Sequence, residues 1–161
     1  MYNIGDKIVY PMHGAGIIEN IERKEILGKE RQYYILSFLS GDLKIMVPIE
    51  KSEEVGVRGI INREDVAKIQ DVLSKPSTPM ANNWNRRYRE NLDKIKSGDA
   101  FQVAEVARNL YRVEKTKNLS AGEKKMLENA MKILKSELAL SMDITVEEAF
   151  DLLYNAMEND H

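Results

Sequence analysis

The residues of this chain best suited to contact a partner molecule lie at 82–89, where the single tryptophan precedes a group of arginines. Trp84 and Tyr88 are four residues apart and share one face of a helix, while Arg86 and Arg89 share the neighbouring face. Guanidinium groups neutralise phosphates, and a flat ring can stack on a base or wedge against one. The pattern therefore indicates a nucleic-acid surface.

A second interpretation fits the same stretch. In it, Trp84 packs the start of the helix against the core, and the arginines, Arg87 among them, pair with Glu90 and Asp93. Composition alone leaves both interpretations open, so the choice depends on the rest of the chain.

The formal net charge of -2 hides a strong asymmetry along the chain. Residues 84–135 contain 13 Lys and Arg against 7 Asp and Glu, a net charge of +6, whereas residues 136–161 contain 7 acids and no Lys or Arg. A basic block beside an acidic one favours an anionic partner for one surface. Two solvated helix faces of opposite sign would give the same counts.

Few residues of this chain could support catalysis. The sequence has no cysteine and 2 histidines, His13 and the final His161, which excludes disulfides, thiol nucleophiles and cysteine-ligated zinc. It has no GxxxxGK or GxGxxG motif, and the glycines after His13 are typical of a β-turn. We therefore expect neither an enzyme nor a bound cofactor or metal.

Length and hydropathy describe a soluble globular chain. The 161 residues suffice for one domain or two small ones, and 43% hydrophobic with 31% charged residues is usual for such proteins. No apolar run approaches the roughly 18 residues of a membrane span, and the opening residues lack the pattern of a signal peptide. We therefore expect a cytoplasmic protein that does not engage a membrane.

Up to Pro48 the pattern predicts short antiparallel strands, because runs rich in Val, Ile, Tyr and Phe alternate with turn residues. In the last run, Lys44 and Met46 share one face, opposite Ile45 and its apolar neighbours. Strands this few and this short favour a small Tudor/SH3-like antiparallel β-barrel. The predicted strands are residues 7–10, 17–26, 33–39 and 43–47, with turns at 27–30 and 40–42.

After Pro48 the hydrophobic period changes from two residues to between three and four, which predicts helices. Asn62 is the expected cap of the first helix. Ser120 and Thr145, each followed three residues later by a glutamate, are expected to form capping boxes. The predicted helices are residues 62–74, 84–98, 99–117, 120–140 and 145–157.

Apolar residues of the third and fourth predicted helices form continuous stripes and are expected to be core. We predict an α+β fold, with the small β-barrel in residues 1–52 and an all-helical C-terminal domain in residues 53–161. The stripe residues are Val103, Val106, Ala107, Leu110 and Tyr111 in one helix and Met126, Ala130, Ile133, Leu134 and Leu138 in the other.

Blocks of sequence in five places, in order and over nearly the whole chain, resemble the CarD/CdnL family of bacterial transcription regulators. Any one block would be weak, but five in register are specific. The blocks are residues 5–16 (GDKIVYPMHGAG), 41–48 (GDLKIMVP), 55–58 (VGVR), 83–88 (NWNRRY) and 119–127 (LSAGEKKML).

The resemblance implies a protein that binds RNA polymerase and promoter DNA. A Tudor-like N-terminal domain would dock on the lobe of the polymerase β subunit. The helical domain would contact DNA at the upstream edge of the melted region, where a tryptophan wedge in the minor groove stabilises the open complex without sequence-specific readout. The residues assigned to DNA in this way are Trp84 as the wedge, Arg86, Arg87 and Arg89 as phosphate contacts, and Lys124 and Lys125 on the basic surface.

On the polymerase-binding side the chain departs from the family pattern. Relatives carry basic residues at the positions of Lys24 and Met46, so only the first of these keeps its charge here. The polymerase contact is therefore expected to use apolar packing of Met46, the charge of Lys44, or strand pairing at the barrel edge.

Two other interpretations stay open. One is an RNA-binding or ribosome-associated SH3-like barrel protein, in which Trp84 and the arginines stack on and hold unpaired bases. The other is an interaction adaptor in which Trp84 belongs to the core. No heptad seam is evident, so the chain is expected to be a monomer. The resemblance implies that it reaches the nucleoid through RNA polymerase.

Overall fold

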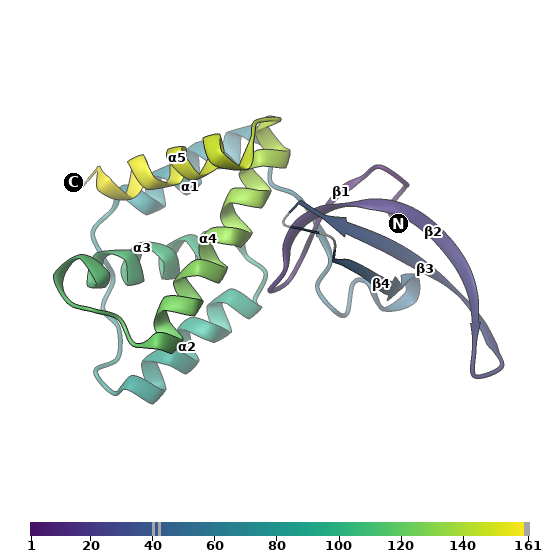
Figure 1. Ribbon diagram of the computed structural model, residues 1–161, viewed down its shortest axis with the longest axis horizontal. Coiled ribbons are helices and arrows are strands. Elements are labelled where there is room, and N and C mark those ends of the chain that lie inside the picture. Colours follow the sequence, from purple (N-terminus) through teal and green to yellow (C-terminus); the bar gives the residue numbers. More distant parts are fainter. Residues whose placement is uncertain (40, 42, 160–161) are drawn as a thin grey trace.

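The computed structural model describes residues 1–39, 41 and 43–159, in which an antiparallel sheet is followed by helices. Sheet and helices form two units placed side by side (Figure 1), which confirms the predicted α+β fold. The strands are β1 (Lys7–Tyr10), β2 (Gly14–Ile26), β3 (Lys29–Phe38), β4 (Lys44–Pro48) and β5 (Arg58–Gly59), with the short 3-10 helix η1 (Ile49–Lys51) after β4. The helices are α1 (Arg63–Ser74), α2 (Trp84–Lys96), α3 (Ala100–Thr116), α4 (Ala121–Met142) and α5 (Val146–Glu158).

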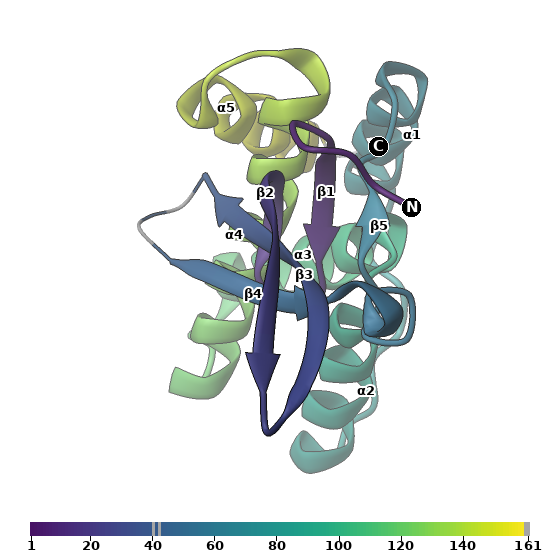
Figure 2. The same ribbon diagram turned by 90° about the vertical axis from the view of Figure 1, so that its right-hand side faces the viewer.

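The strands form one open, curved sheet, so the predicted closed barrel is wrong (Figure 2). Their order is β4-β3-β2-β1-β5, and neighbouring strands are antiparallel. Closure would require β5 to pair with β4 at the other edge. β5 is only 2 residues long and pairs with β1 instead, so the two edges stay apart among the described residues.

The β2–β3 hairpin has a tighter turn than the sequence predicts. Ile26 and Lys29 are paired, so the turn consists of Leu27 and Gly28 alone, with φ of 55° and 76°. Positive φ at both positions matches the twist of the flanking strands and lets them pair up to the turn. The predicted turn at 27–30 is therefore too long. The other predicted turn, at 40–42, falls on residues that lie partly outside the described ones.

The sheet extends past residue 52, the boundary predicted between the two domains. Arg58 on β5 pairs with Val9 on β1, and Val57 just before it packs in the core of the sheet. The last strand of the sheet therefore lies within residues 53–161.

The two faces of the sheet differ in character. One face carries an apolar core, and on the other Asn20, Ile35 and Met46 lie in register across β2, β3 and β4. The predicted alternation in β4 is confirmed, because Val47 is buried whereas Met46 is exposed. The sheet core consists of Ile8, Ile18, Tyr34, Leu36, Phe38, Val47 and Val57.

Side-chain caps confirm the predicted starts of three helices. The side chains of Asn62, Ser120 and Thr145 each accept a hydrogen bond from a backbone N–H in the first turn. The capping box predicted at Thr145 is complete. The box predicted at Ser120 is not complete, and the carboxylate of Glu123 accepts hydrogen bonds from the Ser120 hydroxyl and from a guanidinium.

The helices pack around one apolar core, and the predicted stripes in α3 and α4 line it. All the stripe residues are buried except Tyr111, which is partly buried. α4 packs against α1, α2, α3 and α5 and also against β2, so it joins the two units. Within the described part of the chain, every helix is too short or too polar to cross a membrane.

Candidate functional site

Trp84, the first residue of α2, lies at the surface and is 43% exposed. Its ring stacks on that of Tyr88, with centroids 5.2 Å apart and planes inclined by 19°. The indole Nε1 donates a hydrogen bond to Ser120 Oγ at 3.2 Å. The tryptophan is thus held in a defined orientation while part of its ring stays open to a ligand, so it is not a core residue.

Local sequence explains why α2 begins and ends where it does. Asn83 has an extended backbone, and its side chain accepts a hydrogen bond from the Arg86 N–H at 3.0 Å. Gly98 follows the last turn with φ of 76°, a conformation that favours glycine and stops the helix. On α4, Gly122 faces this aromatic pair, and a Cβ there would lie 3.4 Å from Tyr88 Cε2 and 3.8 Å from Trp84 Cζ2.

Arg87 and Glu123 form a buried ion pair that ties the first turn of α2 to the first turn of α4. Arg87 Nε lies 2.9 Å from Oε2 of Glu123, and Nη2 lies 3.1 Å from Oε1. The two side chains are 18% and 3% exposed. Burial raises the pKa of the Glu123 carboxyl, but hydrogen bonds from Arg87 and Ser120 outweigh it and hold that pKa below its usual value.

The remaining predicted DNA-binding cations lie at the surface. Arg86 Nε pairs with Glu90 Oε1 at 2.9 Å, as the interpretation with paired arginines predicts. The two side chains are nevertheless 73% and 49% exposed. Arg89, Lys124 and Lys125 are exposed and take part in none of the ion pairs among the described residues. The structure therefore gives Arg87 a structural partner and leaves the other four cations at the surface.

A further ion pair fastens α2 near its C-terminal end. Lys94 Nζ lies 2.8 Å from Glu105 Oε1 on α3, and this hydrogen bond is the main reason why the pKa of Glu105 is lowered. α2 is thus attached to the helical unit near both of its ends, and Trp84 is its first residue.

The residues predicted to bind polymerase lie together on the sheet face opposite its core. Lys24, Lys44 and Met46 line one surface cavity of about 500 Å³. Met46 is 40% exposed and is flanked across the strand by Ile35. The pairing register brings these residues together, although the prediction of a closed barrel was wrong.

Acidic residues on the same face were not singled out from the sequence. Glu19 pairs with Lys44 at 3.0 Å, and Glu22 pairs with Lys24 at 3.6 Å. The resulting surface is an apolar centre surrounded by ion pairs of both signs. The alternation of Asn20, Glu22 and Lys24 along one strand was the signal that could have indicated it.

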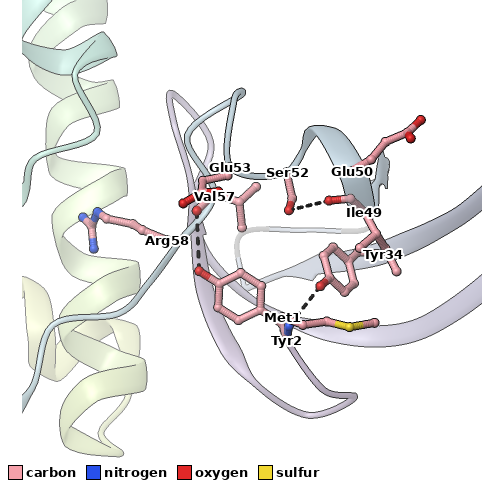
Figure 3. Close-up of a pocket in the computed structure, with 9 residues that line it drawn as sticks. All are labelled: Met1, Tyr2, Tyr34, Ile49, Glu50, Ser52, Glu53, Val57 and Arg58. Atoms are coloured by element: carbon pink, nitrogen blue, oxygen red, sulfur yellow. Dashed lines mark hydrogen bonds between the residues drawn. The ribbon is translucent and has the colours of Figure 1, made fainter.

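Another cavity, of about 560 Å³, lies between the N-terminus and the segment around η1 (Figure 3). The two tyrosine hydroxyls in this cavity form hydrogen bonds within the protein. Tyr34 OH accepts one from the Tyr2 N–H at 2.9 Å, and Tyr2 OH donates one to Val57 O at 3.5 Å. Burial is the main cause of the raised pKa of Tyr2. The Arg58 side chain points out of this cavity toward the helices.

The acidic helix α5 lies at the opposite end of the helical unit from α2, in both views (Figures 1 and 2). Phe150 and Tyr154 on α5 are exposed and stacked, with centroids 6.2 Å apart. Distance along the helical unit therefore separates the acidic surface from the basic one around Trp84.

Both units of the chain, the open sheet and the helical unit with its exposed Trp/Arg surface, match known protein families. Residues 2–61 match the family described as CarD-like/TRCF RID domain, and residues 68–154 match the family described as CarD, C-terminal domain. The chain therefore belongs to the CarD family, as the five sequence blocks predicted.

A curated relative supports this assignment. YdeB of Bacillus subtilis (strain 168), named as a candidate transcription factor, is 42% identical over 145 residues. The matched region covers 90% of this chain and 95% of YdeB, so the likeness extends over both units.

Proposed function

We propose that this protein is a CarD-like transcription regulator that binds RNA polymerase through its sheet and promoter DNA through its helical unit. The sheet binds the lobe of the polymerase β subunit. Trp84 enters the minor groove at the upstream edge of the melted region and stabilises the open complex. Family membership supports a regulator rather than an enzyme.

The exposed ring of Trp84 is the observation that carries this proposal. The aromatic side chain costs free energy when left in water, yet it stands at a helix start, oriented by Tyr88 and Ser120. Arg86 and Arg89 flank it at the surface, and an apolar ring flanked by guanidinium groups suits insertion between base pairs with phosphate contacts on either side.

The face lined by Lys24, Lys44 and Met46 is the proposed polymerase contact. Its apolar centre at Met46 can be buried on binding, while the lysines exchange Glu19 and Glu22 for acidic groups of the partner. Attachment to polymerase places Trp84 near the promoter at high effective concentration. Affinity for free duplex DNA is then weak, and the protein reaches the nucleoid as a monomer bound to polymerase.

The energetics require only a modest preference for melted DNA. A wedge that binds the open complex better than the closed one shifts their ratio by its differential affinity. At about 1 to 3 kcal/mol, a value typical of stacking on a base, the ratio changes about five- to a hundredfold.

Permanganate reactivity of melted thymines tests the proposal at equilibrium. With purified bacterial RNA polymerase on a promoter that opens incompletely, wild-type protein should raise the reactivity of the melted thymines. Trp84→Ala should not raise it, and Trp84→Phe should retain part of the effect because it keeps a flat ring. Equal reactivity with wild type and Trp84→Ala would refute the wedge.

An RNA-binding protein is the alternative, favoured by the same exposed ring and cations. It predicts co-purification with RNA and a loss of RNA affinity for Trp84→Ala, without any binding to polymerase. Co-sedimentation with polymerase, compared between wild type and Met46→Glu, separates the two functions, because only the proposed function requires the Met46 face.

A further inference from the structure

Arg58 on the edge strand β5 connects the sheet to two helices at once. Its Nη1 and Nη2 donate to the two carboxylate oxygens of Glu137 on α4, at 2.7 and 2.9 Å. Its Nε donates to the backbone carbonyl of Gly98, just beyond the end of α2, at 2.6 Å. One guanidinium therefore touches the sheet, the central helix and the end of the helix that starts at Trp84.

Glu137 is completely buried, and both of its carboxylate oxygens accept hydrogen bonds. In addition to its two bonds with Arg58, its carboxylate accepts the backbone N–H of Ile61 at 2.8 Å, in the link between the two units. Glu137 lies on the apolar stripe of α4, whose other residues, such as Leu134 and Leu138, belong to the core. A buried charge costs free energy unless it is paired, so an arrangement of sheet and helices that separated Glu137 from Arg58 would be destabilised.

A second contact beside this pair fixes the same arrangement. The Ala15 N–H on β2 donates to Ser136 Oγ at 2.9 Å, and a Cβ at Gly14 would lie 2.7 Å from that oxygen. The sheet thus approaches α4 closely enough to require glycine, with Ser136 and Glu137 as adjacent anchors. Met12, in the turn between β1 and β2, packs on the core of the helical unit.

α4 therefore carries the anchors of both proposed binding surfaces. Near its start it holds the Trp84 end of α2 through Ser120 and Glu123, and about 21 Å further along it holds the sheet through Glu137. The far end of α2 is held by Arg58 as well. Sheet face and tryptophan are in this way connected by polar contacts with defined directions.

We infer that Arg58 and Glu137 are positioning residues that keep the sheet and the tryptophan at one fixed distance and angle, so that the protein spans polymerase and promoter as a rigid spacer. The inference rests on the proposed function and adds a requirement to it. Effective concentration is high only when the connector matches the span of the two sites, and it falls when the connector becomes flexible.

The double variant Arg58→Met/Glu137→Gln is designed to loosen the junction without unfolding it. It removes both charges of the pair together, which proteins tolerate far better than removal of one. In Glu137→Gln the amide oxygen can still accept the Ile61 N–H, so no backbone donor is left buried and unpaired. Lys75→Met/Asp71→Asn, which removes an exposed ion pair of α1 at 3.0 Å, is the matched control.

Distances between spin labels test the positioning directly. The sequence has no cysteine, so Gln32→Cys on β3 and Asp151→Cys on α5, both exposed positions, introduce the two labelling sites. We expect a narrow distance distribution in the wild-type and control backgrounds, and one at least about twice as broad in Arg58→Met/Glu137→Gln. A distribution of wild-type width in that variant would overturn the inference.

Open-complex half-life at saturating protein tests the consequence. The variant should bind polymerase with an affinity within about twofold of that of wild type, since its sheet face is intact. The factor by which it lengthens the half-life should be about tenfold smaller than the factor for wild type. Arg58→Lys, which keeps the charge but loses the forked geometry, should recover part of the effect. A broad distance distribution together with a wild-type half-life would overturn the inference. If the wild-type protein itself leaves the half-life unchanged, the proposed function fails, and the label distances still decide whether the pair holds the two units together.

Discussion

The two ends of the helical unit carry similar aromatic pairs with opposite charge around them. Trp84 and Tyr88 stack at 5.2 Å on α2, and Phe150 and Tyr154 stack at 6.2 Å on α5. Trp84 and Phe150 are 43% and 41% exposed. The α2 segment contains 5 Lys and Arg against 2 acids, whereas the α5 segment contains 4 acids and no Lys or Arg.

This difference shows that an exposed aromatic pair does not by itself define a nucleic-acid surface. The charges around the ring decide which partner can approach, because phosphates are attracted to α2 and repelled by α5. The α5 pair therefore serves as an internal control for every substitution in the α2 pair.

The largest expected effect is on stability, at the ion pair that holds the start of α2. Arg87→Ala should lower the free energy of unfolding by about 3 kcal/mol, because it leaves the buried Glu123 carboxylate without its cation. The same change at the neighbouring exposed arginine, Arg86→Ala, should cost less than about 0.5 kcal/mol. Urea denaturation measures both, and equal losses would contradict the distinction drawn between these two arginines.

Neutralising the two surfaces should affect promoter binding unequally. Arg86→Gln/Arg89→Gln should weaken binding to the polymerase–promoter complex about tenfold and reduce the salt dependence of log K by about 2, one unit for each lost phosphate contact. Glu147→Gln/Asp151→Asn on α5 should leave affinity and salt dependence unchanged or slightly improve them. Fluorescence anisotropy at several salt concentrations measures both, and a comparable loss in the α5 variant would break the contrast between the two ends.

Truncating the exposed rings should have a smaller effect on folding. Trp84→Ala and Phe150→Ala should each cost about 1 kcal/mol of unfolding free energy, since both rings are partly in water. Leu134→Ala, in the core of the helical unit, should cost about 3 kcal/mol. Chemical denaturation distinguishes these values, and a loss for Trp84→Ala as large as that for Leu134→Ala would support the adaptor in which the tryptophan is core.

The smallest expected effect is a pH dependence at Glu123. Because the pKa of its carboxyl is lowered in the folded state, its contribution is complete above about pH 4.5 and is lost as the pH falls through the lowered pKa. The stability difference between wild type and Glu123→Gln should therefore be constant from pH 7 to about 5 and shrink in more acidic solution. A difference that grows on acidification would contradict the ion pair.

Local features of this fold could be predicted from the sequence, and contacts across the fold could not. Asn62 and Thr145 cap helices through interactions within one turn, so their spacing is sufficient to identify them. The barrel was predicted from the length and number of the strands. These do not specify which strand β5 pairs with, and β5 pairs with β1. The register of that strand depends on contacts between residues far apart in the chain.

The candidate site divides in the same way. Residue type and helical spacing were enough to single out Trp84 and Arg86, and both lie at the surface. The burial of Arg87 could not be predicted, because its partner Glu123 lies 36 residues away and already had a local interpretation as half of a capping box. Glu137 did leave a signal, an acid within an apolar helical stripe, which indicates a buried partner before the partner is known.

Dissociation of a preformed open complex tests most directly whether Trp84 is a wedge. Open complexes of bacterial RNA polymerase, formed with saturating wild type, Trp84→Ala or Phe150→Ala, are challenged with heparin and their half-lives are measured. Wild type and Phe150→Ala should lengthen the half-life about five- to a hundredfold, and Trp84→Ala, folded and bound to polymerase, should leave it near the value without protein. A half-life with Trp84→Ala equal to that with wild type would contradict the wedge.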